Sequence, residues 1–497
     1  MLLKELIKSA GLCFPDNAGN FQVKGITSDS RRVRPGFVFV AVCGSSFDGH
    51  KFIPEAIRKG AKVIICEIPS QRPAVQRKIT YIKTGDTRRA LAELLNHFHG
   101  QPSLNLKVVG ITGTNGKTTV SYLIEAILKY AHFNPAVIGT INYRFKQRVL
   151  KADNTTPAAE LLQPLLARMR KAKVDYVITE VSSHALDQQR VESVKFSSAI
   201  FTNLTQDHLD YHRDLNSYFF AKSRLFRGLE KNSFAVVNLD DARAGDLIKS
   251  TRARVVTYGI LNKRADVSCR HACFNLKGTE FSLRLSNRIK KNFPLKQAQV
   301  KIATRLIGRH NLYNILAAAA FSLVQGIGPQ IIAKAVGEFR GVPGRLEKVT
   351  TKKGFTVFID YAHTEDALIN VISSLRPLCK GRLLVVFGCG GSRDKTKRPK
   401  MGRAVTSLAD LAIITSDNPR NEDPKEIIKD IIAGIEGKNY RAVPKRREAI
   451  KEALSLAGNN DIILIAGKGH EHYQVFKDRV VHFDDREAVR ECLGLKK

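Results

Sequence analysis

The segment Gly113–Thr119 reads Gly-Thr-Asn-Gly-Lys-Thr-Thr, and its residue types predict chemistry more clearly than any other part of the chain. Glycines in such a turn let backbone N–H groups curl around phosphate oxygens, and a helix that begins directly after the turn adds the positive end of its dipole. We expect Lys117 to reach the β- and γ-phosphates of a nucleotide and Thr118 to hold Mg²⁺. The strict pattern has glycine at the position of Ile111, so the prediction depends on the expected strand 106–111 before the turn and a helix after it. A purely structural glycine turn is the alternative.

Acidic and imidazole side chains follow the next two expected strands. Glu180 ends the apolar segment 176–179, and the carboxyl ends of parallel strands face the crevice in which ligands bind. Glu180 is therefore placed to coordinate Mg²⁺ beside a triphosphate, unless it is an ordinary surface glutamate. The segment Asp207–His212, after strand 199–201, is rich in Asp and His, which suits ligand binding and a structural role equally. Lys222, farther along a helix-like segment, is by itself only a basic residue.

The elements that would position these groups fall into three blocks. Short apolar strands and one helix fill the first block, whereas strands and helices alternate regularly in the second, which predicts a mostly parallel sheet. A second doubly wound pattern starts near Gly341. The 497 residues also exceed what one hydrophobic core usually holds. We therefore expect an α/β protein with a small N-terminal α/β domain (1–88), a central P-loop mononucleotide-binding parallel-sheet domain (89–340) and a C-terminal Rossmann-like domain (341–497).

The composition is strongly basic. The chain has 81 Lys and Arg residues against 46 Asp and Glu, a net charge of +35, and the resulting field should attract anions. Nucleic acid is one interpretation of this charge. However, the basic residues are scattered and form no basic–aromatic stripe, which favours sites for anionic small molecules. We therefore expect no nucleic-acid partner.

Several features bear on the cellular compartment. Residues 1–11 carry charges inside a short apolar stretch and lack the apolar core and cleavage site of a signal peptide. The longest nearly apolar run, 315–324, is about half a membrane span. The cysteines are widely spaced, and Cys269 and Cys273 around His271 lack the second half of a zinc site. We expect a cytoplasmic protein with free thiols and no membrane insertion.

Taken together, the motifs resemble those of the Mur ligases, in the order that this family shows and over nearly the whole chain. They are GTNGKTT at Gly113–Thr119, EVSSH at Glu180–His184, TNLTQDHLDYH at Thr202–His212, AK at Ala221–Lys222, GRHNLYN at Gly308–Asn314, GVPGRLE at Gly341–Glu347 and DYAHT at Asp360–Thr364. The resemblance implies an ATP-dependent acid–amino-acid ligase with three domains. The N-terminal domain would hold a UDP-sugar, the middle domain ATP and the C-terminal domain the incoming amino acid.

The same resemblance implies roles for individual residues of the nucleotide site. Glu180 and His208 would bind Mg²⁺ together with Thr118. Lys222 would be carbamylated by CO₂, because an ammonium beside the metal is repelled whereas a carbamate ligates it. The catalytic residues would be Lys117, Lys222, Glu180 and His208. ATP would contact Gly113, Thr114, Asn115, Gly116, Lys117, Thr118, Thr119, Asn311, Arg345 and Asp360.

Further segments resemble the branch of the family that adds meso-2,6-diaminopimelate to UDP-N-acetylmuramoyl-L-alanyl-D-glutamate. The segment Asp417–Arg420 matches the diaminopimelate motif, in which a second substrate carboxylate needs the bidentate fork of Arg420. Glu471 would pair with the distal ammonium. The substrate-binding residues implied are Ser28, Ser30, Ser45, Ser46 and Phe47 for the uridine part, Asn154, Thr155, Thr156, Ser182, Gln188 and Arg190 in the substrate loops, and Arg393, Asp417, Asn418, Pro419, Arg420, Gly467 and Glu471 for diaminopimelate. The reaction would pass through an acyl phosphate in peptidoglycan precursor synthesis, on which cell shape and division depend, and we expect a monomer.

Two positions depart from the family pattern, and two other functions stay open. Glu365 stands where proline is usual and Thr396 where glycine is frequent, and neither is among the proposed catalytic groups. Another ligase of the superfamily, such as a folylpolyglutamate synthetase or a D-Ala-D-Ala-adding enzyme, is one alternative. The other is a basic nucleic-acid-binding ATPase, whose hydrolysis of ATP would be stimulated by DNA or RNA with a steep salt dependence.

Overall fold

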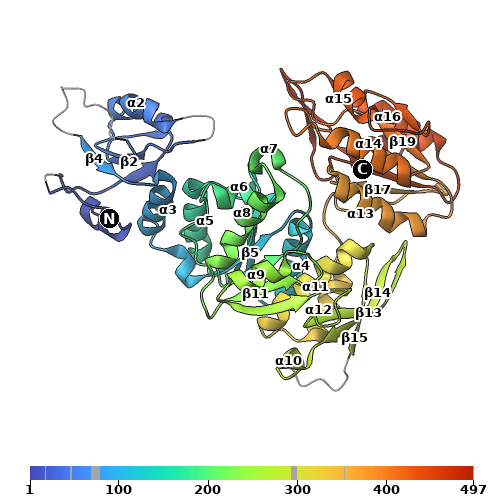
Figure 1. Ribbon diagram of the computed structural model, residues 1–497, viewed down its shortest axis with the longest axis horizontal. Helices are drawn as coiled ribbons and strands as arrows, with labels where there is room; N and C mark the ends of the chain where they lie inside the picture. The colour runs from blue at the N-terminus through green and yellow to red at the C-terminus, as the bar shows by residue number, and fades with distance from the viewer. Residues whose placement is uncertain (17, 45–47, 69–78, 293–298, 352, 496–497) are drawn as a thin grey trace.

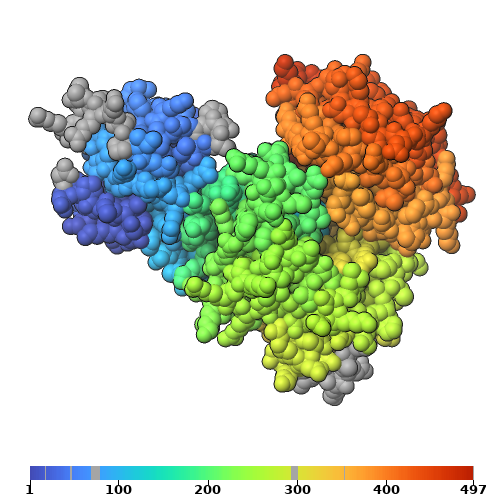
Figure 2. Space-filling view, in the orientation of Figure 1, coloured from blue at the N-terminus to red at the C-terminus, as the bar shows by residue number. Residues whose placement is uncertain are grey.

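The computed structural model describes residues 1–16, 18–44, 48–68, 79–292, 299–351 and 353–495. The chain forms three α/β units, and the central unit lies between the N-terminal and the C-terminal one (Figure 1). The space-filling view shows a hollow between the two outer units, beside the central one (Figure 2). The predicted fold class is confirmed.

The N-terminal unit is a four-stranded parallel sheet in the order β1-β2-β3-β4. Its strands are short and β-branched, and their side chains alternate between the two faces. On β2, Val38 and Val40 pack with α1 and α3, whereas Phe39 packs on the opposite face with α2. The elements are β1 (Gly25–Thr27), β2 (Phe37–Val40), β3 (Val63–Cys66), β4 (Thr80–Lys83), α1 (Leu3–Ser9), α2 (Ile53–Arg58) and α3 (Thr87–Phe98).

The central unit contains an eleven-stranded sheet in the order β15-β14-β13-β12-β11-β10-β5-β9-β6-β7-β8. The strands from β13 to β6 in this order are parallel, and antiparallel strands extend the sheet at both ends. The strands are β5 (Lys107–Thr112), β6 (Pro135–Ile138), β7 (Asn142–Phe145), β8 (Arg148–Lys151), β9 (Tyr176–Glu180), β10 (Ser198–Phe201), β11 (Phe234–Asn238), β12 (Arg254–Tyr258), β13 (Val267–Asn275), β14 (Gly278–Leu285) and β15 (Gln299–Thr304).

Helices cover both faces of this sheet, because its parallel strands are apolar on both sides. Val109 and Ile111 of β5 pack with α4, α11 and α12, whereas Val108 packs on the other face with α5, α8 and α9. The helices are α4 (Lys117–Tyr130), α5 (Ala159–Lys171), α6 (Ser183–Asp187), α7 (Leu209–His212), α8 (Leu215–Arg227), α9 (Ala244–Ser250), α10 (Asn287–Lys290), α11 (Arg309–Val324) and α12 (Pro329–Glu338).

The C-terminal unit is a six-stranded sheet in the order β16-β17-β21-β18-β19-β20, in which only β16 is antiparallel to its neighbour. One face packs against α13, α14 and α15, and the other against α16 and α17. Within the described ranges, no helix of the chain is long and apolar enough to cross a membrane. The elements are β16 (Glu347–Val349), β17 (Thr356–Asp360), β18 (Leu383–Phe387), β19 (Leu411–Ile414), β20 (Tyr440–Ala442), β21 (Ile462–Ala466), a separate ribbon of β22 (Tyr473–Val475) and β23 (Val480–His482), and helices α13 (Glu365–Leu375), α14 (Lys397–Leu408), α15 (Pro424–Ile432), α16 (Arg446–Leu456) and α17 (Asp485–Cys492).

Candidate active site

The glycine-rich turn after β5 has the backbone that the sequence predicts for a phosphate loop. Gly113 and Gly116 have φ angles of +145° and +88°. A Cβ atom on Gly113 would lie 1.9 Å from Thr202 Oγ1, and one on Gly116 would lie 2.3 Å from Asn314 Oδ1. Only glycine fits at these positions. Helix α4 begins at Lys117, so its N-terminus faces the turn as phosphate binding requires.

The side-chain nitrogen atoms of two lysines converge on the carbonyl oxygen of Gly113. Lys117 Nζ donates to this oxygen at 2.9 Å and to the carbonyl of Thr114 at 2.8 Å, and Lys222 Nζ donates to the Gly113 oxygen at 3.0 Å. Lys222 is almost fully buried, and its Nζ lies 4.2 Å from the centroid of the Tyr218 ring. Burial lowers the pKa of Lys222 well below its ordinary value, and the Lys117 cation lowers that pKa further. The site therefore favours the neutral amine of Lys222.

Glu180 lies at the end of β9, directly beside the first turn of α4. Its carboxylate accepts hydrogen bonds from Thr118 Oγ1 at 2.8 Å, from Thr140 Oγ1 at 2.9 Å and from the Thr140 backbone N–H at 3.1 Å. The predicted proximity of Glu180 and Thr118 is thus present. Thr140, which no motif of the sequence indicated, helps to orient the carboxylate.

His208 lies in a cluster of aromatic and imidazole rings. Its Nε2 is 3.4 Å from Asp207 Oδ2, and its ring centroid is 4.8 Å from that of His184. Burial lowers the pKa of His208 far below its ordinary value, which keeps the ring neutral, as metal ligation requires. Burial by itself would raise the pKa of Asp207, but its interactions with His208, His363 and Lys397 hold it below the ordinary value.

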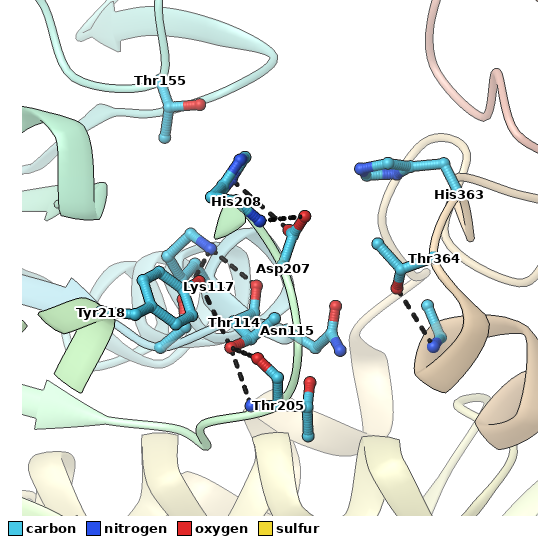
Figure 3. Close-up of polar contacts among 12 residues, drawn as sticks. Thr114, Asn115, Lys117, Thr155, Thr205, Asp207, His208, Tyr218, His363 and Thr364 are labelled. Carbon is cyan, nitrogen blue, oxygen red and sulfur yellow. Dashed lines mark hydrogen bonds and ion pairs between the residues drawn. The ribbon is translucent and has the colours of Figure 1, made fainter. Parts of the chain in front are cut away.

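The cluster faces the C-terminal unit across a gap. Figure 3 shows Lys117, Tyr218, His208 and Asp207 around the phosphate loop, with His363 on the opposite side. Thr114 connects the loop to the segment that follows β10, because its Oγ1 donates to the Thr205 carbonyl at 3.1 Å and accepts from the Thr205 N–H at 3.0 Å.

The donor atoms of this site suit Mg²⁺. Thr118 and Glu180 present oxygen atoms, which this ion prefers, and Mg²⁺ commonly binds through one or two carboxylates plus the phosphates of its substrate. The part of the chain that the structure describes has no group of three or more His, Cys, Asp or Glu side chains arranged for metal binding. A site that shares its metal with bound phosphates fits this limited donor set.

A cavity of about 700 Å³ lies between the central and C-terminal units. The phosphate loop, the start of α11, the linker before β16 and the start of α13 all contribute to its wall. The residues predicted for nucleotide binding that line it are Asn115, Gly116, Thr119, Asn311, Arg345 and Asp360. The cavity therefore unites residues that lie more than 200 positions apart along the chain.

Arg345 connects the two units at this cavity, and Asp360 supports the backbone next to it. Arg345 Nη2 donates to Thr118 Oγ1 at 3.4 Å, and its guanidinium lies 4.6 Å from the centroid of the Tyr361 ring. The Asp360 carboxylate accepts from the backbone N–H groups of Leu346 at 2.6 Å and Ala362 at 2.7 Å. Asp360 thus connects the segment that follows Arg345 to the end of β17 within the C-terminal unit.

A second junction contact involves Asp366 on α13. Its carboxylate accepts from Asn115 Nδ2 at 2.8 Å and from Thr205 Oγ1 at 3.2 Å.

Replacing Asp366 with alanine should weaken nucleotide binding roughly tenfold, because a hydrogen bond to a carboxylate contributes about 1.5–3 kcal/mol and both donors belong to the loop side of the cavity. Titration calorimetry with ADP would measure the effect. Glu365→Ala, on the same helical turn, is the matched control; equal losses in the two variants would contradict this role of Asp366.

The predicted amino-acid site lies at the carboxyl ends of the parallel strands of the C-terminal sheet. Asp417–Arg420 follows β19, Gly467–Glu471 follows β21, and the loop with Arg393 follows β18. These strands are neighbours in the order β21-β18-β19, so their loops meet at one edge of the sheet, as expected for ligand binding in doubly wound folds.

Tight backbone contacts shape this edge. Gly467 has φ +115°, and a Cβ atom there would lie 2.8 Å from Asp417 Oδ2. A Cβ atom on Gly391 would lie 1.9 Å from the carbonyl oxygen of Pro419. The loop after β18 is therefore closely packed against the loop after β19. Arg420 is half-buried, has φ +53° and donates from Nη1 to the Gly391 carbonyl at 2.7 Å. Its guanidinium is thus held at the edge of the loop that follows β18.

Asn418 and Glu471 are joined directly, and a residue that the sequence analysis did not select lies beside them. Asn418 Nδ2 donates to Glu471 Oε2 at 2.9 Å. Lys468 is fully buried, and its Nζ donates to Asn418 Oδ1 at 3.1 Å and to Glu471 Oε2 at 3.3 Å. Burial raises the pKa of the Glu471 carboxyl, whereas Lys468 acts in the opposite direction. Arg393 is exposed, and its charge helps to lower the pKa of His184 in the central unit, although burial of His184 is the larger cause.

The predicted substrate loops of the central unit are contiguous with Glu180. Thr156 Oγ1 donates to the Glu180 carbonyl at 2.8 Å and accepts from the Ser182 N–H at 3.0 Å. Arg190 Nη1 donates to the Thr156 carbonyl at 2.9 Å, and its guanidinium also binds Gln188 Oε1. Nearby, Thr155 Oγ1 lies 3.1 Å from Thr140 Oγ1, and the Asn154 carbonyl accepts from Tyr143.

The described residues predicted to bind uridine contact side chains of the protein itself. Ser28 Oγ donates to Glu160 of α5 at 3.2 Å, and Ser30 Oγ donates to Glu55 at 2.6 Å. Both hydroxyls therefore bind protein carboxylates, and Ser28 connects the N-terminal and central units. Ser45, Ser46 and Phe47 lie outside the described residues.

The fold and the site define a three-unit nucleotide-binding enzyme with a phosphate loop and a group of charged side chains at the carboxyl edge of its C-terminal sheet. Models of the Mur ligase middle domain, the Mur ligase glutamate ligase domain and the Mur ligase catalytic domain match residues 111–322, 344–469 and 22–99. The chain belongs to the Mur ligase family.

Individual relatives are similar over almost the whole chain. A UDP-N-acetylmuramoyl-L-alanyl-D-glutamate–2,6-diaminopimelate ligase from Clostridium botulinum is 42% identical over 95% of each chain, and one from Aquifex aeolicus is 43% identical over 95% of this chain and 94% of its own. A solved structure of a ligase with this name has a TM-score of 0.69 and 32% identity over 98% of each chain. A MurF ligase from Thermotoga maritima in complex with ADP shares the fold, with a TM-score of 0.62 and 18% identity over 95% of this chain and 97% of its own.

Proposed function

We propose that the chain is an ATP-dependent ligase that adds meso-2,6-diaminopimelate to UDP-N-acetylmuramoyl-L-alanyl-D-glutamate. The observation that carries this proposal is the grouping of Arg420, Asn418 and Glu471 at the carboxyl edge of the C-terminal sheet. A guanidinium beside a carboxylate suits the distal carboxylate and ammonium of diaminopimelate. The relatives at 42–43% identity carry this activity in their names.

The three domains would divide the substrates between them. Residues 1–88 would hold the UDP-sugar, residues 89–340 ATP, and residues 341–497 the amino acid. The open hollow between the outer units (Figure 2) gives space for the UDP-linked dipeptide to reach the phosphate loop. Closure of the domains would then bring the reacting groups together and exclude water.

An amine cannot form an amide with a carboxylate directly, because the carboxylate oxygen is a poor leaving group, so the carboxylate is first activated. The γ-phosphoryl group of ATP is transferred to the D-glutamate carboxylate, which gives an acyl phosphate and ADP. The free amine of diaminopimelate attacks the acyl carbon, a tetrahedral intermediate forms, the amine loses a proton and inorganic phosphate leaves. Lys117 and the N-terminus of α4 stabilise the negative charge on the transferred group.

Mg²⁺ would be held by Thr118 and Glu180, with His208 and a carbamate on Lys222 as further ligands. It would neutralise phosphate charge during transfer. The neutral amine of a buried lysine is the form that reacts with CO₂, so the lowered pKa of Lys222 supports its carbamylation.

The location and assembly belong to the same proposal. All eight cysteines are free thiols, which suits a reducing cytoplasm. We propose that the enzyme works there as a monomer without membrane insertion. Its product would serve peptidoglycan synthesis and so cell shape and division.

An amino-acid panel tests this function. Purified protein is given ATP, Mg²⁺ and the UDP-linked dipeptide together with meso-diaminopimelate, L-lysine, D-Ala-D-Ala or glutamate, and ADP release is measured. We expect release that requires both the dipeptide and diaminopimelate. Equal use of lysine would contradict the assignment of Arg420, and activity without the UDP-linked dipeptide would contradict the proposed reaction.

A further inference from the structure

Lys468 is a buried cation at the centre of the proposed amino-acid pocket. Its side chain has no exposed surface, and its ammonium lies 3.4 Å from Asp417 Oδ1, 3.1 Å from Asn418 Oδ1 and 3.3 Å from Glu471 Oε2. An ammonium has three donors, and three acceptors surround this one. The contacts connect the loop after β19 to the loop after β21.

The contacts of Lys468 fix the orientation of the groups proposed to bind the substrate. Glu471 Oε2 accepts from both Lys468 and Asn418, and Asn418 Oδ1 also accepts from the Val475 N–H at 3.0 Å. With Oε2 engaged in this way, the contact of Glu471 Oε1 among the described residues is a long one, with Tyr361 OH at 3.5 Å. Lys468 therefore determines which carboxylate oxygen is available to an incoming ammonium.

Lys468 also balances the charge of the pocket. Asp417 and Glu471 contribute two negative charges, and Lys468 and Arg420 contribute two positive ones. Arg446, behind Asp417, is paired with Asp485 through two hydrogen bonds of 2.7 Å and adds no net charge. Arg393 is exposed, and solvent screens its charge.

We propose that Lys468 is a specificity-determining residue that fits this pocket to a zwitterionic side-chain end. With Lys468 present, the nearly neutral pocket matches the distal end of diaminopimelate, which carries one ammonium and one carboxylate. Without it, the pocket has an excess negative charge and favours the purely cationic end of lysine. The inference rests on the proposed function and extends it to a residue that positions Glu471 and Asn418.

Steady-state kinetics of the full-length enzyme with meso-diaminopimelate and L-lysine tests this inference. An assay at about pH 8.5 keeps the carboxyl groups and the lysine ε-ammonium ionised. The variants are Lys468→Met, which keeps the length of the side chain without its charge, and the double variant Lys468→Met/Asp417→Asn, which restores the charge balance. Lys445→Met, at an exposed lysine on the surface, is the matched control.

We expect Lys468→Met to lower the ratio of kcat/KM for diaminopimelate to that for lysine by at least about tenfold, because truncating one partner of a buried, hydrogen-bonded charge pair is costly. The change should lie mainly in KM for diaminopimelate, with KM for ATP unchanged, and the double variant should recover part of the ratio. A purely structural defect would instead lower activity with both amino acids equally.

An unchanged ratio in folded Lys468→Met, or an equal change in Lys445→Met, would overturn the inference while leaving the proposed function intact. Should Lys468→Met fail to fold, the charge-balanced double variant decides: a retained preference for diaminopimelate supports the inference, and a loss of preference overturns it. A wild-type enzyme that used neither amino acid would overturn the proposed function and the inference together.

Discussion

Replacing Lys222 with alanine is expected to lower kcat by about two to three orders of magnitude, the size of effect seen when one preorganised electrostatic group is removed from an active site. The side chain is buried against Gly113 of the phosphate loop and the Tyr218 ring. Alanine cannot form a carbamate, so the metal would lose one anionic ligand. Release of ADP, coupled to an enzymatic readout, measures kcat, and binding of the UDP-linked dipeptide should stay near its wild-type affinity.

Chemical rescue distinguishes the carbamate from a simple packing role. Short carboxylates such as formate or acetate could occupy the space left by the side chain and restore part of the activity of Lys222→Ala. Lys231→Ala, at an exposed lysine beyond the end of α8, should behave as the wild type. Wild-type activity in Lys222→Ala would remove the carbamate from the mechanism. A loss of activity that no carboxylate restores and that accompanies a lower melting temperature would point to packing.

The elements around the phosphate loop could be predicted because local signals agree there. Strand 106–111, the glycine-rich turn and the following helix correspond to β5, Gly113–Thr119 and α4. Apolar runs with β-branched residues likewise located β9 and β10, and the position of Glu180 at the end of β9 follows from the run itself. Where each residue's local conformational preference agrees with its position in the sheet, the sequence is sufficient to predict the element.

The sequence could not show which distant segments meet. Asp366 contacts Asn115 across 251 positions of the chain, and neither residue type indicates the other. No motif of the sequence indicated Lys468, because a lysine is usually exposed, whereas here three acceptors compensate for its burial.

The sequence also does not show how side chains are oriented at the N-terminal turns that are predicted to bind uridine. Ser28 was expected to contact the UDP part, yet its hydroxyl binds Glu160 of another domain. A serine hydroxyl can rotate between partners, so this contact and a ligand contact draw on the same donor. Tertiary pairing of this kind depends on the packing of α5 against the N-terminal sheet and leaves no local pattern.

Replacing Arg420 with alanine is expected to lower kcat/KM for meso-diaminopimelate by about two orders of magnitude, mainly through KM. Loss of one partner from a desolvated, hydrogen-bonded charge pair costs about 2–5 kcal/mol, and the distal carboxylate of the substrate would lose its cation. Arg420 has a positive φ of +53°. Alanine retains the Cβ atom, so the backbone strain at this position is nearly the same in the variant, whereas glycine would change both the strain and the charge.

Arg420→Lys separates the role of charge from that of geometry. Lysine keeps the positive charge but lacks the planar fork that binds a carboxylate through two parallel hydrogen bonds, so it should recover only part of the affinity. Activity with L-lysine as substrate should fall far less in either variant, because lysine has no distal carboxylate. Arg403→Ala, on the exposed face of α14, serves as the control. Only recognition of the second carboxylate makes the variant respond differently to the two amino acids. If Arg420→Ala lost activity with lysine and diaminopimelate to the same extent, Arg420 would therefore support the loop after β18 through its contact with Gly391 and would not bind the substrate carboxylate.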